Sequence, residues 1–140
     1  MGLDLGSRTI GVALSDESGV VAQPLLTLQR RGVTRDLEAL GALVTRWQVG
    51  RIVVGLPLRL DGRRGPEAAS AAEFASRLAA ALGVPVSTWD ERLTTTAAEK
   101  AMLEADLSRE RRRLARDRVA AALMLQGYLD AGRPRPEPAG

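Results

Sequence analysis

The order of the apolar patterns along the chain is the feature that most constrains its fold. Apolar residues alternate with small or polar ones on both sides of a Gly-Ser-Arg-Thr turn at 6–9, which predicts a β-hairpin over residues 3–14. A third strand is predicted at 20–28, where Pro24 favours a sheet edge or a bulge. Three consecutive antiparallel strands therefore open the fold.

The periodicity then changes to alternating helices and strands. Residues 34–47 carry apolar side chains at helical spacing, with Thr34 as the expected N-cap, and 67–82 form an alanine-rich helix that stops at Gly83. The apolar run 52–54 is typical of a buried central strand. A strand is also predicted at 86–91, and helices at 94–103 and 117–129, with an arginine-rich stretch at 106–116 between them.

This order predicts an α/β domain of three layers, in which a mixed sheet carries helices on both faces. The chain of 140 residues is long enough for one domain, which we assign to 1–132, followed by a disordered Pro- and Arg-rich tail at 133–140. The chain has no Cys, no apolar run of the ~20 residues that a membrane span needs, and no basic segment followed by an apolar one at its start. We expect a cytoplasmic protein without membrane contact.

Three acidic residues stand in apolar surroundings far apart in the sequence: Asp4, Glu91 and Asp117. A carboxylate that faces a core must be paired, protonated or metal-bound, because its removal from water costs several kcal/mol. The chain has neither His nor Cys, so that imidazole and thiolate chemistry are both excluded. Oxygen ligands remain, and carboxylates gathered from distant segments favour Mg²⁺ or Mn²⁺ beside a phosphate-bearing substrate.

Each acid also has a structural interpretation. Asp117 could stabilise a helix N-terminus, and Glu91 could be a solvated loop residue or a partner of Arg92. In a strand over 86–91, Asp90 and Glu91 would point to opposite faces, so only one of them could serve a given site. Asp4 is the hardest to explain structurally, because apolar residues flank it inside a strand.

The positive charge is almost entirely arginine, since Lys100 is the sole lysine, and the net charge is +3. GC-rich coding would produce the same bias without any function. Its distribution is more informative, because six arginines crowd around Asp117 and would repel one another without an anionic partner. These residues are Arg109, Arg111, Arg112, Arg113, Arg116 and Arg118.

Four segments resemble the motifs of the YqgF (RuvX) family in the ribonuclease H-like superfamily: GLDLGSRTIGVA at 2–13, VGLP at 54–57, DERLTT at 90–95, and DRVAA at 117–121 with LQGYL at 125–129. The resemblance implies a five-stranded mixed sheet in which the first strand, the fourth-strand region and the final helix converge. It also implies that Asp4, Glu91 and Asp117 are the catalytic metal ligands and that Asp90 is not. The chain departs from the family at 59–62, where relatives usually show an Asn-Met-Asp-Gly type of segment, and at Met1, before which relatives usually have several more residues.

The resemblance leads us to expect a divalent-metal-dependent endonuclease for structured nucleic acid, with two Mg²⁺ or Mn²⁺ ions ~3.5–4 Å apart. Processing of the 5′ end of pre-16S rRNA is the first expectation, and resolution of four-way DNA junctions is the alternative. A monomer or weak homodimer is expected. Phosphate contacts are predicted for the turn at 6–9, for Arg92 and for the arginine cluster, that is for Ser7, Arg8, Thr9, Arg92, Arg109, Arg111, Arg112, Arg113 and Arg116.

Two other classes of function stay open. The segment DLGS at 4–7 also resembles the phosphate loop of actin-like ATP-binding proteins, but those proteins duplicate the domain and need a much longer chain. A catalytically silent RNA-binding module is the third possibility. The presence of all three acids argues against it.

Overall fold

The computed structural model describes residues 1–93 and 109–132, and of the helix that begins at Arg109 it describes side chains only from Arg116 onward. The helix expected at 94–103 and the tail at 133–140 lie outside the described residues. The strands are β1 (Gly2–Leu5), β2 (Thr9–Ser15), β3 (Ala22–Gln29), β4 (Ile52–Leu56) and β5 (Val86–Asp90). The helices are α1 (Val33–Trp47), α2 (Pro66–Leu82) and α4 (Arg109–Asp130), and a 3₁₀ turn, η1, spans Glu91–Leu93.

The five strands form one mixed sheet in the order β3-β2-β1-β4-β5. The first three strands pair antiparallel, as the alternation predicted, and β1, β4 and β5 run parallel. The edge position of β3 and a register shift between Val12 and Ala13, opposite Pro24, agree with what the proline indicated. The predicted fold class is therefore confirmed.

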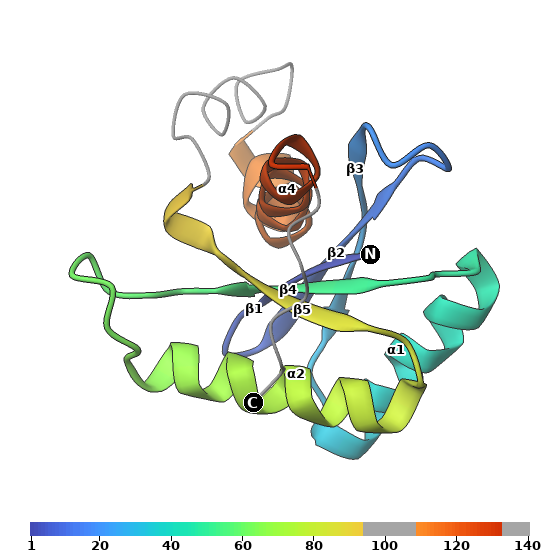
Figure 1. Ribbon diagram of the computed structural model, residues 1–140, viewed down its shortest axis with the longest axis horizontal. Coiled ribbons are helices and arrows are strands. Elements are labelled where there is room, and N and C mark those ends of the chain that lie inside the picture. Colours follow the sequence, from blue (N-terminus) through green and yellow to red (C-terminus); the bar gives the residue numbers. More distant parts are fainter. Residues whose placement is uncertain (94–108, 133–140) are drawn as a thin grey trace.

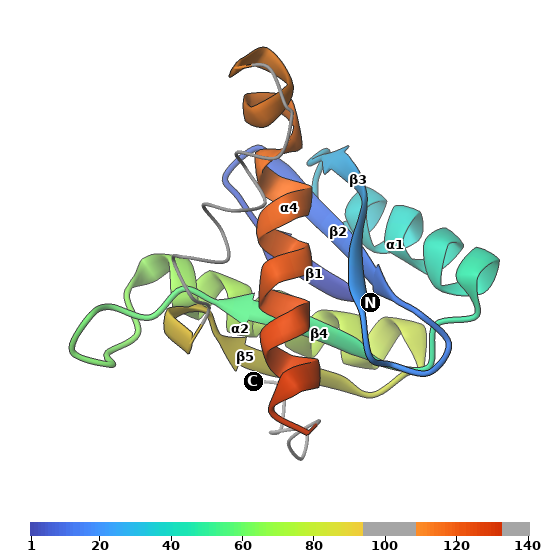
Figure 2. The same ribbon diagram turned by 90° about the horizontal axis from the view of Figure 1, so that it is seen from above.

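Helices cover both faces of the sheet (Figures 1 and 2): of those that the structure describes, α1 and α2 lie on one face and α4 on the other. Apolar residues of β1, β2 and β4 pack with α1 and α2 in a core that includes Leu3, Ile10, Val54 and Leu78. A second core joins Ala13 and Val53 to the face of α4 that carries Ala121 and Leu125. No described helix has both the length and the apolar character needed to cross a bilayer.

Several of the predicted element boundaries are wrong, and two of them concern the starts of helices. Helix α1 begins after Gly32 rather than with Thr34 as its cap, because Asp36 reaches back to accept the Arg31 N–H at 2.9 Å and Gly32 adopts a φ of 108°. Helix α4 begins eight residues before Asp117, so the arginine-rich stretch is partly helical instead of a separate connection. Asp117 consequently lies inside a helix and cannot be explained as its N-terminal cap.

Candidate active site at the carboxyl end of the parallel strands

The carboxyl ends of β1, β4 and β5 share one edge of the sheet because these strands are parallel. Asp4 lies near the end of β1, and Glu91 follows the end of β5, not the fourth strand that the resemblance implied. The Glu91 carboxyl group donates a hydrogen bond to Asp4 across the intervening β4. Two acids that are 87 residues apart in the sequence thus form a direct pair.

The path of Glu91 across β4 depends on Gly55. A Cβ at this position would lie 3.0 Å from the Glu91 Cγ and closer still to its Oε1, a separation that real Cβ atoms do not show. Any other residue at position 55 would therefore push Glu91 away from Asp4. This close approach explains why position 55, in the segment VGLP, is a glycine.

The environment of Glu91 favours its protonated form. Burial, the hydrogen bond to Asp4, and the negative charges of Asp4 and Asp90 raise the pKa of Glu91 to about 8. At neutral pH the pair therefore holds one proton between two carboxylates. A proton in this position neutralises charge that a divalent cation would also neutralise.

Asp117 approaches the same end of the sheet from α4. Its Oδ2 accepts a hydrogen bond from the Thr9 hydroxyl, and its carbonyl oxygen lies directly over Gly11. Gly11 is the register partner of Asp4 on the neighbouring strand β2. A Cβ at Gly11 would lie 2.8 Å from the Arg118 nitrogen and closer to the Asp117 carbonyl, so this glycine lets α4 settle onto the sheet beside Asp4.

Within residues 1–93 and 116–132, however, no three acids are grouped closely enough to hold a metal ion. The structure therefore brings Asp4 and Glu91 together, while the Asp117 carboxylate is held by Thr9 one strand away. The pair nonetheless fits a Mg²⁺ or Mn²⁺ ion, because its donors are all carboxylate oxygens and such ions are commonly bound by one or two carboxylates plus phosphate oxygens.

Asp90 has a different role from Glu91. Its two carboxylate oxygens accept hydrogen bonds from the Arg92 guanidinium at 2.6–3.0 Å, and these lower the pKa of Asp90. The sequence predicted that strand alternation would separate the two acids. This prediction is wrong, because β5 ends at Asp90 and Glu91 begins a 3₁₀ turn. Arg92 in turn donates to the Leu60 carbonyl at 3.2 Å.

The residues predicted to bind nucleic acid fall into three groups. Ser7, Arg8 and Arg116 are exposed at the surface. Thr9 and Arg92 are engaged within the protein, with Asp117 and Asp90 respectively. The remaining four side chains, those of Arg109, Arg111, Arg112 and Arg113, lie outside the described part of the chain.

Sequence reasoning missed the two glycines as functional positions. Gly11 and Gly55 both lie inside strands, where glycine is unfavourable unless a bulge or another group requires the space. A glycine within a strand pattern indicates that another group packs closely against the backbone at that position, and this pattern is visible in the sequence.

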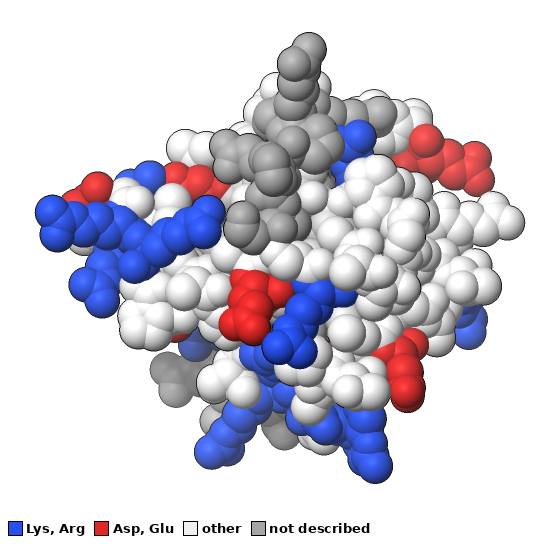
Figure 3. Space-filling model, turned by 60° about the horizontal axis from the view of Figure 1, so that its bottom comes forward, with Lys and Arg blue, Asp and Glu red and all other residues white. Residues whose placement is uncertain are grey.

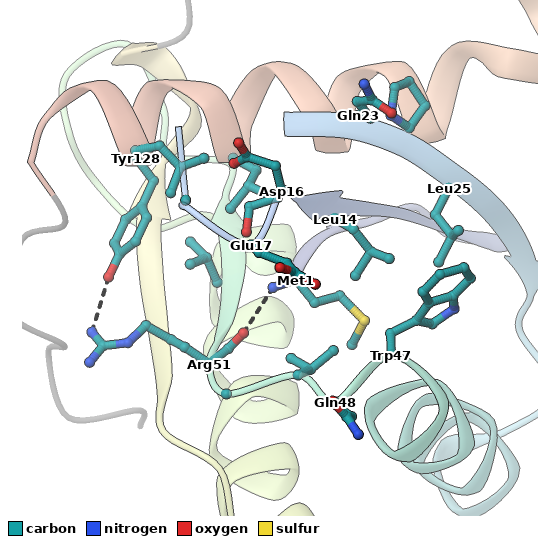
Figure 4. A pocket seen from close by; sticks show the side chains of 18 residues that line it. Met1, Leu14, Asp16, Glu17, Gln23, Leu25, Trp47, Gln48, Arg51 and Tyr128 are labelled. Carbon is teal, nitrogen blue, oxygen red and sulfur yellow. Dashed lines mark hydrogen bonds between the residues drawn. The ribbon is translucent and has the colours of Figure 1, made fainter. Parts of the chain in front are cut away.

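A pocket of about 800 Å³ lies at the opposite end of the sheet and contains none of the predicted site residues (Figure 4). Apolar side chains such as Leu14, Trp47 and Leu125 line much of it. Several of its polar groups are hydrogen-bonded: the Met1 ammonium donates to the Arg51 carbonyl at 2.8 Å, and the Arg51 guanidinium donates to the Tyr128 hydroxyl at 3.1 Å. The pocket also contains two acids, Asp16 and Glu17, but Asp16 accepts hydrogen bonds from the Ser18 hydroxyl and from the Val20 and Val21 N–H groups, which lower its pKa instead of raising it.

Comparisons with known proteins agree with the fold and identify the family. A chain from Myxococcus xanthus named "Putative pre-16S rRNA nuclease" is 52% identical over 134 residues, which cover 96% of this chain and 89% of that one. A relative of the same name from Moorella thermoacetica is 55% identical over 130 residues, 93% of each chain. Among solved structures, Thermus thermophilus RuvC in complex with a Holliday junction substrate matches with a TM-score of 0.64 and 20% identity, over 97% of this chain and 98% of that chain.

The model of the RuvX family, described as Holliday junction resolvase, matches residues 1–131. This range includes all the strands of the sheet and each of the three acids. Together with relatives above 50% identity over nearly the whole chain, it shows that the protein belongs to the RuvX family.

Proposed function

We propose that this protein is a divalent-metal-dependent endonuclease that processes the 5′ end of pre-16S rRNA. The observation that carries the proposal is the Asp4–Glu91 pair, in which two carboxylates from separate strands meet at the edge shared by three parallel strands. Holding two half-buried acids together costs stability, so the arrangement is expected where it serves chemistry. The names of the relatives from two bacteria support the choice of substrate.

In this proposal Asp4 and Glu91 hold Mg²⁺ or Mn²⁺, and Glu91 releases its proton when the ion binds. When bound, the metal would activate water and stabilise the leaving oxygen of a phosphodiester. Gly55 keeps Glu91 within reach of Asp4, and Thr9 fixes the orientation of the Asp117 carboxylate. Asp117 is proposed as the third catalytic acid, and the two-ion arrangement expected from the resemblance remains part of the proposal.

The exposed residues of the turn between β1 and β2 would contact the substrate backbone beside the acids. Ser7 and Arg8 lie at the surface of this turn, which is closed by a hydrogen bond from the Gly6 N–H to the Thr9 carbonyl at 2.8 Å. Arginine is suited to this contact because its planar guanidinium can bind two phosphate oxygens at once. The arginine cluster before Asp117 is proposed to hold the flanking strand.

Resolution of four-way DNA junctions is the second candidate. It is favoured by the description of the matching family model and by the fold shared with a RuvC solved on such a junction. A resolvase makes paired symmetric cuts and so requires a twofold dimer. The two candidates therefore differ in substrate and in the assembly that cuts it.

Cleavage assays separate these candidates. End-labelled precursor 16S RNA carrying its 5′ leader, duplex RNA and a four-way DNA junction are incubated side by side with the protein in Mg²⁺, Mn²⁺ or EDTA. The proposal expects metal-dependent cleavage of the precursor RNA at its 5′ side. Cleavage of the junction alone would replace it by the second candidate, and no cleavage of any substrate in either metal would refute a nuclease.

A further inference from the structure

The loop at 57–65, which joins β4 to α2, starts at the same end of the sheet as Glu91. A turn closes it, since the Arg59 N–H donates to the Arg63 carbonyl at 2.9 Å and the Gly62 N–H donates to the Arg59 carbonyl at 2.8 Å. Arg92 anchors this turn to the end of β5 through the Leu60 carbonyl at 3.2 Å. The loop is therefore fixed next to the residue that follows Glu91.

Leu60 at the tip of this loop is 97% exposed, more than the other large apolar side chains found at the surface of the described residues. Leu58, two residues earlier, is half-buried against the main core. The loop thus already has an apolar anchor, and Leu60 adds nothing to packing. A single exposed leucine is ordinary on a protein surface, so its meaning depends on what surrounds it.

Basic side chains surround Leu60. Arg59, Arg63 and Arg64 are exposed in the same loop, and Arg63 keeps 84% of its side chain accessible although its Nε lies 3.6 Å from the Asp61 carboxylate. Figure 3 shows basic side chains gathered at the end of the molecule where Figure 1 places this loop. A protruding apolar side chain among arginines, in a loop that starts at the same end of the sheet as the paired acids, is chemically suited to a polyanion that also has apolar faces to contact.

We propose that Leu60 inserts between adjacent bases of the bound RNA while Arg59, Arg63 and Arg64 contact the neighbouring phosphates. Nucleic-acid-binding proteins use apolar side chains in this way to unstack a base step and to bend the strand. The guanidinium contacts offset the cost of unstacking and fix the register of the loop on the backbone. Leu60 is then a specificity-determining contact that selects sites where a base step opens easily.

This inference rests on the proposed function, because Leu60 acts on the substrate of that site. The test uses an RNA hairpin that contains the mature 5′ end of 16S rRNA, with 2-aminopurine placed at one position at a time. Fluorescence of 2-aminopurine rises when its base unstacks. Affinity is measured in parallel by anisotropy in EDTA, and cleavage is measured in Mg²⁺, with the complete chain throughout.

The wild-type protein is expected to raise the fluorescence at one or two adjacent positions. Leu60→Ala should abolish that rise and weaken binding by on the order of tenfold, whereas Leu60→Met should restore both because it keeps an apolar side chain of similar reach. The matched control is Val20→Ala, which removes an exposed apolar side chain at the β2–β3 turn and should change neither quantity. All three variants should unfold near the wild-type temperature, since the side chains are exposed.

A fluorescence rise in Leu60→Ala equal to that of the wild type would overturn the insertion of Leu60. Cleavage of the RNA by wild type without any fluorescence rise would overturn it as well and leave the nuclease intact. Absence of both binding and cleavage would instead refute the proposed function, and the inference with it.

Discussion

The two ends of the sheet differ in the partners that their polar groups have. At the carboxyl end of the parallel strands, Glu91 crosses Gly55 to reach Asp4, and two acids share a proton. At the other end, a pocket of mixed polar and apolar lining contains hydrogen bonds of ordinary length from Met1 and Arg51. The cations at the pocket end donate to neutral partners, whereas the other end brings two acids together and so favours the protonated form of one of them.

This difference indicates that the end with the Asp4–Glu91 pair is where a bound cation would stabilise the protein. Like charges held together lower the stability of the protein until a cation or a proton neutralises them. At the pocket end, the charged form of Asp16 is already stabilised by hydrogen bonds from Ser18, Val20 and Val21. Substitutions that affect chemistry should therefore concentrate at the acidic end, and substitutions at the pocket end should affect stability alone.

The largest effect is expected from Asp4→Asn. The change keeps the shape of the side chain and removes its charge, so metal-dependent cleavage of precursor RNA should fall by on the order of a hundredfold or more. The comparison variant is Trp47→Ala, which removes a half-exposed side chain from the pocket and should leave the cleavage rate unchanged. Cleavage by Asp4→Asn at the wild-type rate in Mg²⁺ would end the interpretation of this pair as a metal site.

Gly55→Ala should have the next largest effect. The new Cβ would overlap with Glu91, displace it from Asp4 and reduce cleavage by roughly tenfold to a hundredfold. Gly50→Ala is the matched control, since a Cβ at Gly50, which lines the pocket, would meet no atom within 4 Å. If the two variants cleave equally well, the contact of Glu91 with Asp4 is not needed for activity.

Much of the fold could be predicted because the hairpin and the helix-strand alternation are local patterns. The end of β5 was not predictable from residues 86–91 themselves. It is set by β4, whose last pair with β5 is Leu56–Asp90 and which is followed by Pro57, a residue without an N–H to continue a ladder. Glu91 therefore leaves the strand and can turn toward Asp4.

The start of α4 was missed for a different reason. The repulsion among the arginines argues against a helix there, but arginine has a high helix propensity and no breaker occurs in residues 109–116. The three acids could be selected from the sequence by their apolar neighbours and by the family motifs. Their grouping could not, because the contact of Asp117 with Thr9 depends on how closely α4 approaches Gly11.

Replacing Arg111, Arg112 and Arg113 together with Ala should weaken binding and leave the chemical step nearly unchanged. Each phosphate contact adds about −0.9 to the slope of log affinity against log salt on a duplex. Loss of up to three contacts should therefore make this slope less negative by up to the amount that three contacts contribute. The measurement is a salt titration of binding for the triple variant and for the wild type. An unchanged slope would place the strand-holding surface elsewhere, for example on the loop at 57–65.

The smallest effect is the pH dependence of stability, to which the two ends contribute with opposite signs. Glu91 has a pKa raised from 4.5 to about 8 in the folded protein, so its contribution is complete below pH 4.5 and is lost as the pH rises through 8. The Met1 ammonium has a pKa lowered by burial from 8.0 to about 6, so its contribution is complete above pH 8 and is lost as the pH falls through 6.

In metal-free buffer the stability of the wild type should therefore fall from about pH 4.5 to 6 and then level off, because the two contributions offset each other between pH 6 and 8. Glu91→Gln keeps a hydrogen-bond donor toward Asp4 and removes the titration, so its stability should be flat up to pH 6 and should rise from pH 6 to 8. Urea unfolding in EDTA at intervals between pH 5 and 8.5 would measure both curves. Parallel curves for the two proteins would show that Glu91 does not share a proton with Asp4, and the contrast between the two ends would then lose its electrostatic basis.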